Sequence, residues 1–140
     1  MFSSPSRSAP KVYGFDTGFV RHASGWRDAR PEDLGILWEH YVLNEIQAHH
    51  PDLEVRYWRR KRGPEVDFVL LPGGLPPVAV ECTWRSSNTR NLAGLRSFRE
   101  QYPEGEDFVV CADLEEAQTR RLGERTVRFV GLGGLLEALG

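Results

Sequence analysis

Apolar residues recur at two different spacings along this chain. Between residues 32 and 49 they recur every three or four positions, which is the period of a helix with one buried face. In several shorter segments they alternate with polar residues or form short continuous runs, which is typical of strands. The predicted order is strand 11–15, short helix 19–23, helix 32–49, strands 53–60, 64–70 and 78–84, a helix from 88 or 89 to about 102, strands 108–112 and 126–130, and helix 132–139. Residues 118–123 fit neither pattern clearly.

This order predicts one α/β domain with a central mixed β-sheet and helices packed on it. The turn residues Pro72, Gly73 and Gly74 allow strands 64–70 and 78–84 to pair as an antiparallel hairpin. The helix before strand 108–112 allows that strand to lie parallel to strand 78–84. Residues 1–10, rich in Ser and Pro, are expected to form a disordered leader, and residues 11–140 the single domain.

Composition limits the classes of function without selecting one. The net charge is −2, and of 18 basic residues only Lys11 and Lys61 are lysine. Arginine suits forked contacts with phosphate, although codon usage in a GC-rich genome explains the bias as well. Cys82 and Cys111 lie in apolar runs and are expected to be free buried thiols, as in a reducing cytoplasm. No apolar run reaches the roughly 18 residues needed to span a membrane.

Three acidic residues lie on the two strands of the predicted hairpin. Glu65 and Asp67 share one face of their strand because side chains alternate, and Glu81 shares a face with Thr83 on the next strand. Pairing of the two strands can bring the acids together, where they repel each other unless a cation lies between them. The alternative is a solvated acidic face with arginine partners.

A fourth acid, Glu39, falls within the apolar stripe of helix 32–49, between Ile36 and the pair Leu43 and Ile46. A carboxylate in such a stripe is costly unless something pairs with it. An internal salt bridge explains it as well as a metal does. Asp67 and Glu81 could bind Mg²⁺ or Mn²⁺, with the backbone carbonyl of Cys82 as a third ligand and Glu39 on a second ion or a bound water.

A run of basic residues precedes the acidic hairpin. Its members, Arg59, Arg60, Lys61 and Arg62, are expected to contact the phosphates of a nucleic acid. Trp58 and Trp84 could stack on unpaired bases, but packing in the core explains each of them better. Gly131-Leu132-Gly133-Gly134 lacks the lysine and the serine or threonine of a phosphate-binding loop.

The order of these motifs resembles a known family. The matching stretches are 11–20, 34–45, 57–69, 79–83 and 92–98. Over about residues 11–112 the chain is similar to the uncharacterised domain found at the C-terminal end of many bacterial and archaeal AAA-type ATP-binding proteins, a domain of the restriction-endonuclease-like PD-(D/E)xK superfamily. The resemblance implies a three-layer nuclease fold, a catalytic site built from Glu39, Asp67 and Glu81, and a homodimer as one possible assembly.

The chain departs from that pattern at one position of the site. The superfamily's lysine corresponds to Thr83, which carries no charge, and loss of one preorganised group of this kind typically costs about 10²–10³ in rate. Arg85 is expected two residues further along the same strand face as Glu81 and Thr83, where it could replace the lysine as a charge but hardly as a base. We therefore expect weak metal-dependent hydrolysis of DNA, which Thr83→Lys should raise. The alternative is an inactive nuclease-like module that binds DNA or an AAA-type ATPase partner.

Overall fold

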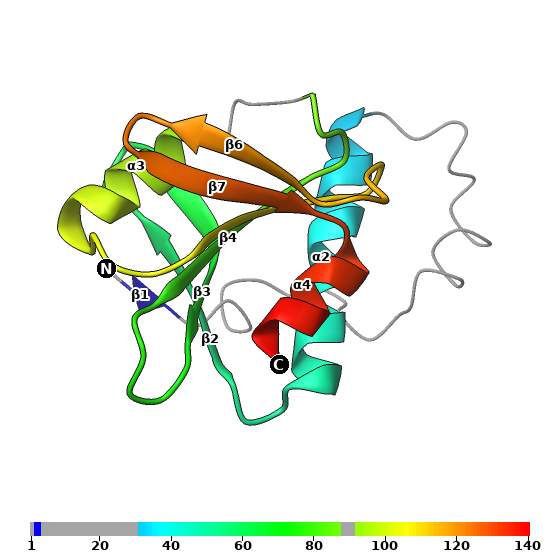
Figure 1. Ribbon diagram of the computed structural model, residues 1–140, viewed down its shortest axis with the longest axis horizontal. Helices are drawn as coiled ribbons and strands as arrows, with labels where there is room; N and C mark the ends of the chain where they lie inside the picture. Colours follow the sequence, from blue (N-terminus) through cyan, green and yellow to red (C-terminus); the bar gives the residue numbers. More distant parts are fainter. Residues whose placement is uncertain (1, 4–30, 88–91) are drawn as a thin grey trace.

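The computed structural model describes residues 2–3, 31–87 and 92–140, so the expected strand 11–15 and short helix 19–23 lie outside the described residues. Most of the expected leader, residues 4–10, also lies outside them. The elements are β1 (Phe2–Ser3), α2 (Pro31–His49), β2 (Glu54–Arg59), β3 (Glu65–Leu71), β4 (Val78–Thr83), α3 (Leu92–Gln101), β5 (Asp107–Cys111), β6 (Gln118–Leu122), β7 (Arg125–Val130) and α4 (Leu132–Leu139) (Figure 1).

The strands form one mixed sheet in the order β1-β2-β3-β4-β5-β7-β6. The first four strands pair antiparallel, and β4, β5 and β7 pair parallel. The edge strand β6 pairs antiparallel with β7. The predicted α/β class, the hairpin of β3 and β4, and the parallel crossover from β4 through α3 to β5 are therefore confirmed.

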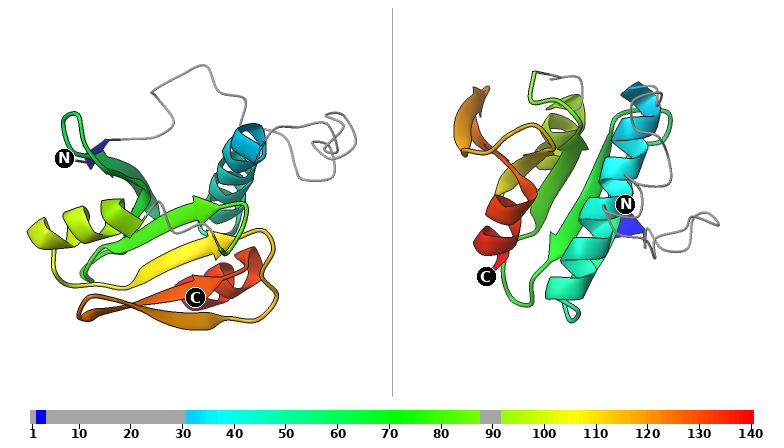
Figure 2. Two further views of the ribbon diagram at one scale, coloured as in Figure 1. Left: turned by 90° about the horizontal axis from the view of Figure 1, so that it is seen from above. Right: turned by 90° about the vertical axis from the view of Figure 1, so that its right-hand side faces the viewer.

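Helices cover both faces of the sheet and create two cores (Figures 1 and 2). Helices α2 and α4 lie on one face and α3 on the other. The first core combines residues of α2 and α4 with one face of the strands, including Leu43, Phe68 and Leu135. The second combines α3 with the opposite face, including Phe98 and Phe129. The arrangement has three layers, helix, sheet and helix.

Two details differ from the sequence patterns. Residues 118–122, which fitted neither pattern, form the edge strand β6, whose polar side chains suit an exposed sheet edge. In α2, Ile36 is 51% exposed and therefore does not belong to the buried stripe. That stripe begins instead at Trp38, whose indole N–H donates to the carbonyl of Val110 at 3.0 Å and thereby ties α2 to β5.

A buried ion network fixes the turn between α3 and β5. Arg99 and Asp107 are both buried, and their side chains meet at 2.7 Å. The other carboxylate oxygen of Asp107 accepts from Arg125 at 2.7 Å. Every N–H of the Arg99 guanidinium group is used, since it also donates to four carbonyl oxygens, those of Pro77, Tyr102, Glu104 and Glu106. The network holds α3, β5 and the start of β4 in one fixed arrangement.

The two cysteines are buried free thiols, as expected, and they lie on opposite faces of the sheet. Cys82 belongs to the core beneath α2, and Cys111 to the core beneath α3. Burial raises the pKa of the Cys111 thiol to about 12. Among the described residues, no helix has the length and apolar character needed to cross a membrane.

Candidate functional site

The strands β3 and β4 are paired over only part of their length. Their register runs from Leu70 opposite Val78 to Phe68 opposite Val80. The next residues beyond this last pair are Asp67 on β3 and Glu81 on β4. From there β3 continues against β2, while β4 continues against β5 as far as Thr83. The two acids predicted as ligands therefore lie where the two central strands separate.

A β-bulge lies at the same place. Between the pairs Arg56–Val69 and Trp58–Val66, the single residue Tyr57 on β2 faces two residues on β3, Asp67 and Phe68. The bulge interrupts the alternation of side chains. Residues three apart on a regular strand point to opposite faces, yet Val66 and Val69 both contribute to the core beneath α3. Bulges redirect side chains and bend the strand that carries them. This one coincides with the position of Asp67, and strand alternation alone could not predict it.

Side chains replace backbone pairing in the gap between β3 and β4. The backbone N–H of Asp67 donates to Glu81 Oε1 at 3.3 Å. The backbone N–H of Cys82 donates to Asp67 Oδ2 at 2.8 Å. Each carboxylate thus accepts a hydrogen bond from the opposite strand. These bonds give both acids a structural role, whatever else they do.

The electrostatics of this acid pair are unfavourable when both carboxylates are charged. Glu81 is only 2% exposed. Burial raises the pKa of Glu81 well above its ordinary value, and the nearby charge of Asp67 raises it further. The pKa of the Cys82 thiol is also raised well above its ordinary value, first by burial and then by Asp67. The acid pair is therefore stabilised either when one carboxylate is protonated or when a cation lies between the two.

Glu39 contributes to the same electrostatic environment from α2. It is partly buried, and its carboxylate adds to the elevation of the pKa of both Glu81 and Cys82. The predicted helix acid and strand acids therefore influence one another. Within the part of the chain that the structure describes, however, no group of three or more His, Cys, Asp or Glu side chains has the geometry of a metal site. A cation here would take further ligands from the backbone, water or a substrate.

Thr83 and Arg85 differ in their setting. Thr83 is the last residue of β4 and is buried, and its hydroxyl donates to the carbonyl oxygen of Arg85 at 3.0 Å. Arg85 lies beyond the strand and is exposed. Its side-chain direction therefore does not follow from strand alternation, which was the basis for placing it on the same face as Glu81.

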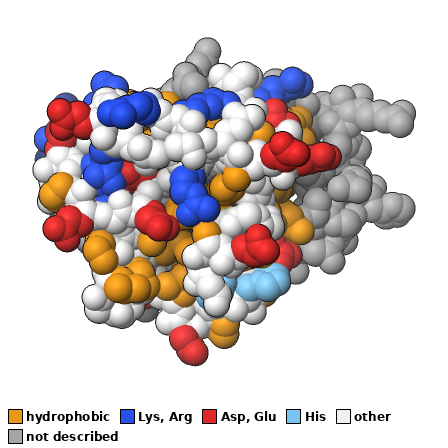
Figure 3. Space-filling view, viewed as in Figure 1, with side chains coloured by type: hydrophobic (Ala, Val, Ile, Leu, Met, Phe, Trp, Pro, Cys, Tyr) orange, Lys and Arg blue, Asp and Glu red, His pale blue; other side chains and the backbone are white. Residues whose placement is uncertain are grey.

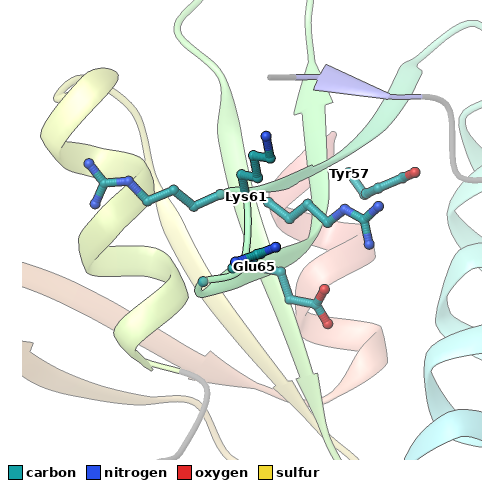
Figure 4. Close-up of a pocket in the computed structure, with 7 residues that line it drawn as sticks. Tyr57, Lys61 and Glu65 are labelled. Carbon is teal, nitrogen blue, oxygen red and sulfur yellow. The ribbon is translucent and has the colours of Figure 1, made fainter.

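The basic run forms the turn between β2 and β3. The backbone N–H of Arg60 donates to Pro64 O and that of Gly63 to Arg60 O, both at 3.0 Å, and Arg62 has a positive φ of 57°. This closed turn borders a hollow of about 570 Å³, in which Lys61 and Glu65 point in different directions (Figure 4). The hollow is lined by Tyr57, Arg59, Arg60, Lys61, Arg62, Gly63 and Glu65.

The four cations of this turn are exposed. Arg60 contacts Ser97 and, at 3.9 Å, Glu100 on α3, whereas Arg59, Lys61 and Arg62 form no ion pair with any described residue. Three positive side chains are therefore available to an anion. Trp58, by contrast, is 1% exposed and packs edge-on against the Phe98 ring at 5.5 Å, so it is a core residue and cannot stack on a base.

Further basic side chains lie over β6 and β7, interspersed with acidic ones (Figure 3). Arg121 and Arg128 are exposed residues of these strands. The mixture of charges agrees with the net charge of −2, and on this face the basic groups do not form a continuous stripe.

Helix α3 approaches the acid pair through a residue that the sequence analysis did not single out. A Cβ added to Gly94 would lie 2.8 Å from the carbonyl carbon of Glu65, closer still to its oxygen, and 3.3 Å from Glu81 Oε1. Gly94 therefore permits direct contact between α3 and the bulged strand. A glycine inside a helical pattern was the available signal for such a close approach.

Comparison with known proteins gives a family and no activity. Two curated proteins, the uncharacterised proteins Mb2031c of Mycobacterium bovis and Rv2008c of Mycobacterium tuberculosis, are each 32% identical over 74 residues. The match covers 50% of this chain and 17% of each relative, so the chain spans a small part of their length.

Among solved structures, a half-complex of Thermococcus gammatolerans McrB AAA+ hexamers with bound McrC aligns with a TM-score of 0.47 and 16% identity. The alignment covers 71% of this chain and 27% of that one. Residues 34–130, which include β2, β3, β4 and all the acids discussed above, match a family described as a domain of unknown function, DUF4143. The chain belongs to the DUF4143 family.

Proposed function

We propose that this chain is a metal-dependent DNA phosphodiesterase of the restriction-endonuclease-like PD-(D/E)xK superfamily. The observation that carries the proposal is the contact between Asp67 and Glu81 where β3 and β4 separate. Glu81 is buried, its pKa is raised, and Asp67 lies against it. Two carboxylates in such a place are stabilised by a hard divalent cation, which offsets their repulsion.

The residues divide into ligands and phosphate contacts. Asp67 and Glu81 would bind Mg²⁺ or Mn²⁺, and Glu39 would hold a second ion or a water. When bound, the cation supplies a Lewis acid that polarises the scissile phosphate and lowers the pKa of an attacking water. The turn formed by Arg59, Arg60, Lys61 and Arg62 would contact flanking phosphates.

The donor set fits such a cation only in part. Mg²⁺ commonly uses one or two carboxylates and completes its octahedral shell with waters and phosphate oxygens. The acid pair meets this requirement, and the carbonyl of Cys82 follows directly on β4. Because the described residues contain no ready group of three metal-binding side chains, we expect weak affinity without substrate and tighter binding with it.

A second candidate function is an inactive module that binds DNA or an AAA-type ATPase partner. It is favoured by Thr83, which carries no charge at the position of the superfamily's lysine. It is also favoured by the hydrogen bonds of Asp67 and Glu81 to backbone N–H groups, since these give the acids a purely structural reason to be present.

Hydrolysis assays decide between the two candidates. Wild-type protein, Asp67→Asn and the control Asp52→Asn are incubated with duplex, branched and single-stranded DNA and Mn²⁺. Asp52 is an exposed turn residue, so Asp52→Asn makes the same chemical change away from the site. The phosphodiesterase predicts cleavage by wild type and Asp52→Asn, and loss of cleavage in Asp67→Asn or with EDTA. Binding of DNA without cleavage of any substrate supports the inactive module.

A further inference from the structure

The segment that follows β4, residues 84–87, is held by side chains from two other parts of the sheet. The N–H of Ser86 donates to Asp113 Oδ1 at 2.8 Å, and its hydroxyl lies 3.4 Å from Asp113 Oδ2. Arg120 Nη1 donates to the carbonyl of Ser86 at 2.9 Å. Asp113 follows β5, and Arg120 belongs to the edge strand β6. Both backbone polar groups of Ser86 are therefore fixed by distant residues.

Thr83 fixes the same segment from its other end. Its hydroxyl donates to the carbonyl of Arg85 at 3.0 Å, and its own carbonyl accepts from Ala112 N at 3.2 Å. Thr83 is 4% exposed, so this hydroxyl is shielded from water. The backbone of Arg85 consequently lies between two anchored residues.

The side chain of Arg120, which donates to Ser86, is itself held in place by two further contacts. Its Nη2 donates to Gln118 at 2.9 Å, and its guanidinium carbon lies 4.0 Å from the centre of the Phe129 ring. A cation over an aromatic face gains electrostatic attraction and loses mobility. Because Phe129 is buried, the contact ties Arg120 to the core beneath α3.

We propose that Thr83, Asp113 and Arg120 are positioning residues that fix the backbone at Arg85, two residues beyond the end of β4, so that its guanidinium group can reach a phosphate held at the acid pair. On this view Thr83 contributes by anchoring the residue that carries the charge, and it does not replace the lysine chemically. Arg85 is exposed and forms no ion pair with a described residue, so its guanidinium group is available to a phosphate. This inference rests on the proposed phosphodiesterase activity.

A fixed backbone matters for the part that the guanidinium group of Arg85 plays in catalysis. A guanidinium group stays charged and can stabilise the negative charge that develops on the phosphate, but it does not remove a proton. Its contribution depends on placement before the reaction, because a misplacement of about 1 Å can cost about 10²-fold in rate. Thr83→Lys would add an amine but also remove the anchor of Arg85, so Thr83→Val and Thr83→Ser form the more informative pair.

The first test requires no activity. The bond between Arg85 and Ser86 is a site for trypsin, and its cleavage in the native protein is followed by mass spectrometry. The proposal predicts slow cleavage in wild type and Thr83→Ser, and faster cleavage in Thr83→Val and Asp113→Asn. Equal cleavage rates in all four proteins, each with an unchanged melting temperature, would overturn the proposed fixing of residues 84–87.

The second test measures turnover of DNA with Mn²⁺. Arg85→Ala should lower kcat by about 10²–10³-fold, and added guanidinium ion should restore part of the loss. Thr83→Val and Arg120→Gln should lower kcat by up to about 10²-fold, while Thr83→Ser retains it and the affinity for Mn²⁺ stays unchanged. Arg121→Gln, an exposed neighbour on β6, is the matched control for Arg120.

The outcomes separate the two proposals. An active wild type in which Thr83→Val and Arg120→Gln turn over DNA normally would overturn the positioning role and leave the phosphodiesterase intact. A wild type that hydrolyses no DNA would overturn the phosphodiesterase and the role of Arg85 together. This holds even where slow cleavage by trypsin shows that residues 84–87 are fixed.

Discussion

Replacement of Gly94 by alanine tests whether close contact between α3 and β3 shapes the acid site. The added Cβ would lie 2.8 Å from the carbonyl carbon of Glu65, whereas carbon atoms prefer a separation of about 3.5–4.0 Å. The nearest obstacles are backbone atoms, which cannot rotate away, so α3 must move from β3 by on the order of 1 Å. Overpacking of this kind typically costs about 1–3 kcal/mol.

The control is a second helical glycine. A Cβ added to Gly35 in α2 would meet nothing within 4 Å, so Gly35→Ala should gain the helix preference of alanine over glycine, about 1 kcal/mol. Gly94→Ala makes the same gain but must also displace α3, so we expect a net loss of up to about 2 kcal/mol. For a chain of this size that corresponds to a fall in Tm of up to roughly 8 °C.

Urea and thermal denaturation of the two variants measure these differences directly. We expect Gly35→Ala to be more stable than wild type and Gly94→Ala to be less stable. Because the same methyl group would lie 3.3 Å from Glu81 Oε1, Gly94→Ala should also weaken Mn²⁺ binding. A Gly94→Ala protein as stable as Gly35→Ala would refute the packing that we describe around the site.

Three further predictions concern buried ionisable groups. Because the pKa of Glu81 is raised in the folded state, its contribution to stability is present at low pH and is lost as pH rises through that raised pKa. The metal-free protein should therefore lose stability with rising pH. Denaturation at a series of pH values with EDTA measures this loss, which should be smaller in Glu81→Gln. Arg99→Leu leaves the buried Asp107 with Arg125 alone and removes the donor of four carbonyl oxygens. It should cost about 3–5 kcal/mol in urea denaturation, whereas a loss below about 1 kcal/mol would show that the Arg99–Asp107 pair is dispensable. Cys82 and Cys111 are buried with raised pKa values, so both should react with iodoacetamide only after denaturation, and rapid labelling of the native protein would contradict their burial.

The sequence predicted the elements of this fold better than the geometry of its site. Regular periodicity indicated the long helix, the hairpin and the crossover, because each depends on local pattern and chain direction. The edge strand Gln118–Leu122 was missed because its side chains are mostly exposed and polar, which removes the alternation that marks a half-buried strand. Ile36 was assigned to the buried stripe because helical spacing fixes which residues share a side, but not where the sheet ends.

The site depends on features that have no periodic signal. The sequence singled out Asp67, Glu81 and Glu39, but the bulge opposite Tyr57 and the separation of β3 from β4 arise from the packing of the whole sheet. The contact between Thr83 and the backbone of Arg85 likewise depends on the turn after β4. The sequence showed an uncharged Thr83 two residues after Glu81, whereas it did not show the contact that the Thr83 hydroxyl makes.

Calorimetric titration of Mn²⁺ tests the central claim most directly. Wild type, Asp67→Ala and the control Asp52→Ala are compared, with melting curves to establish that each is folded. A metal site at the acid pair predicts saturable binding by wild type and Asp52→Ala, and its loss in Asp67→Ala. Binding of equal strength in Asp67→Ala, or no binding by folded wild type with or without DNA, would contradict the metal-dependent site and favour a binding module.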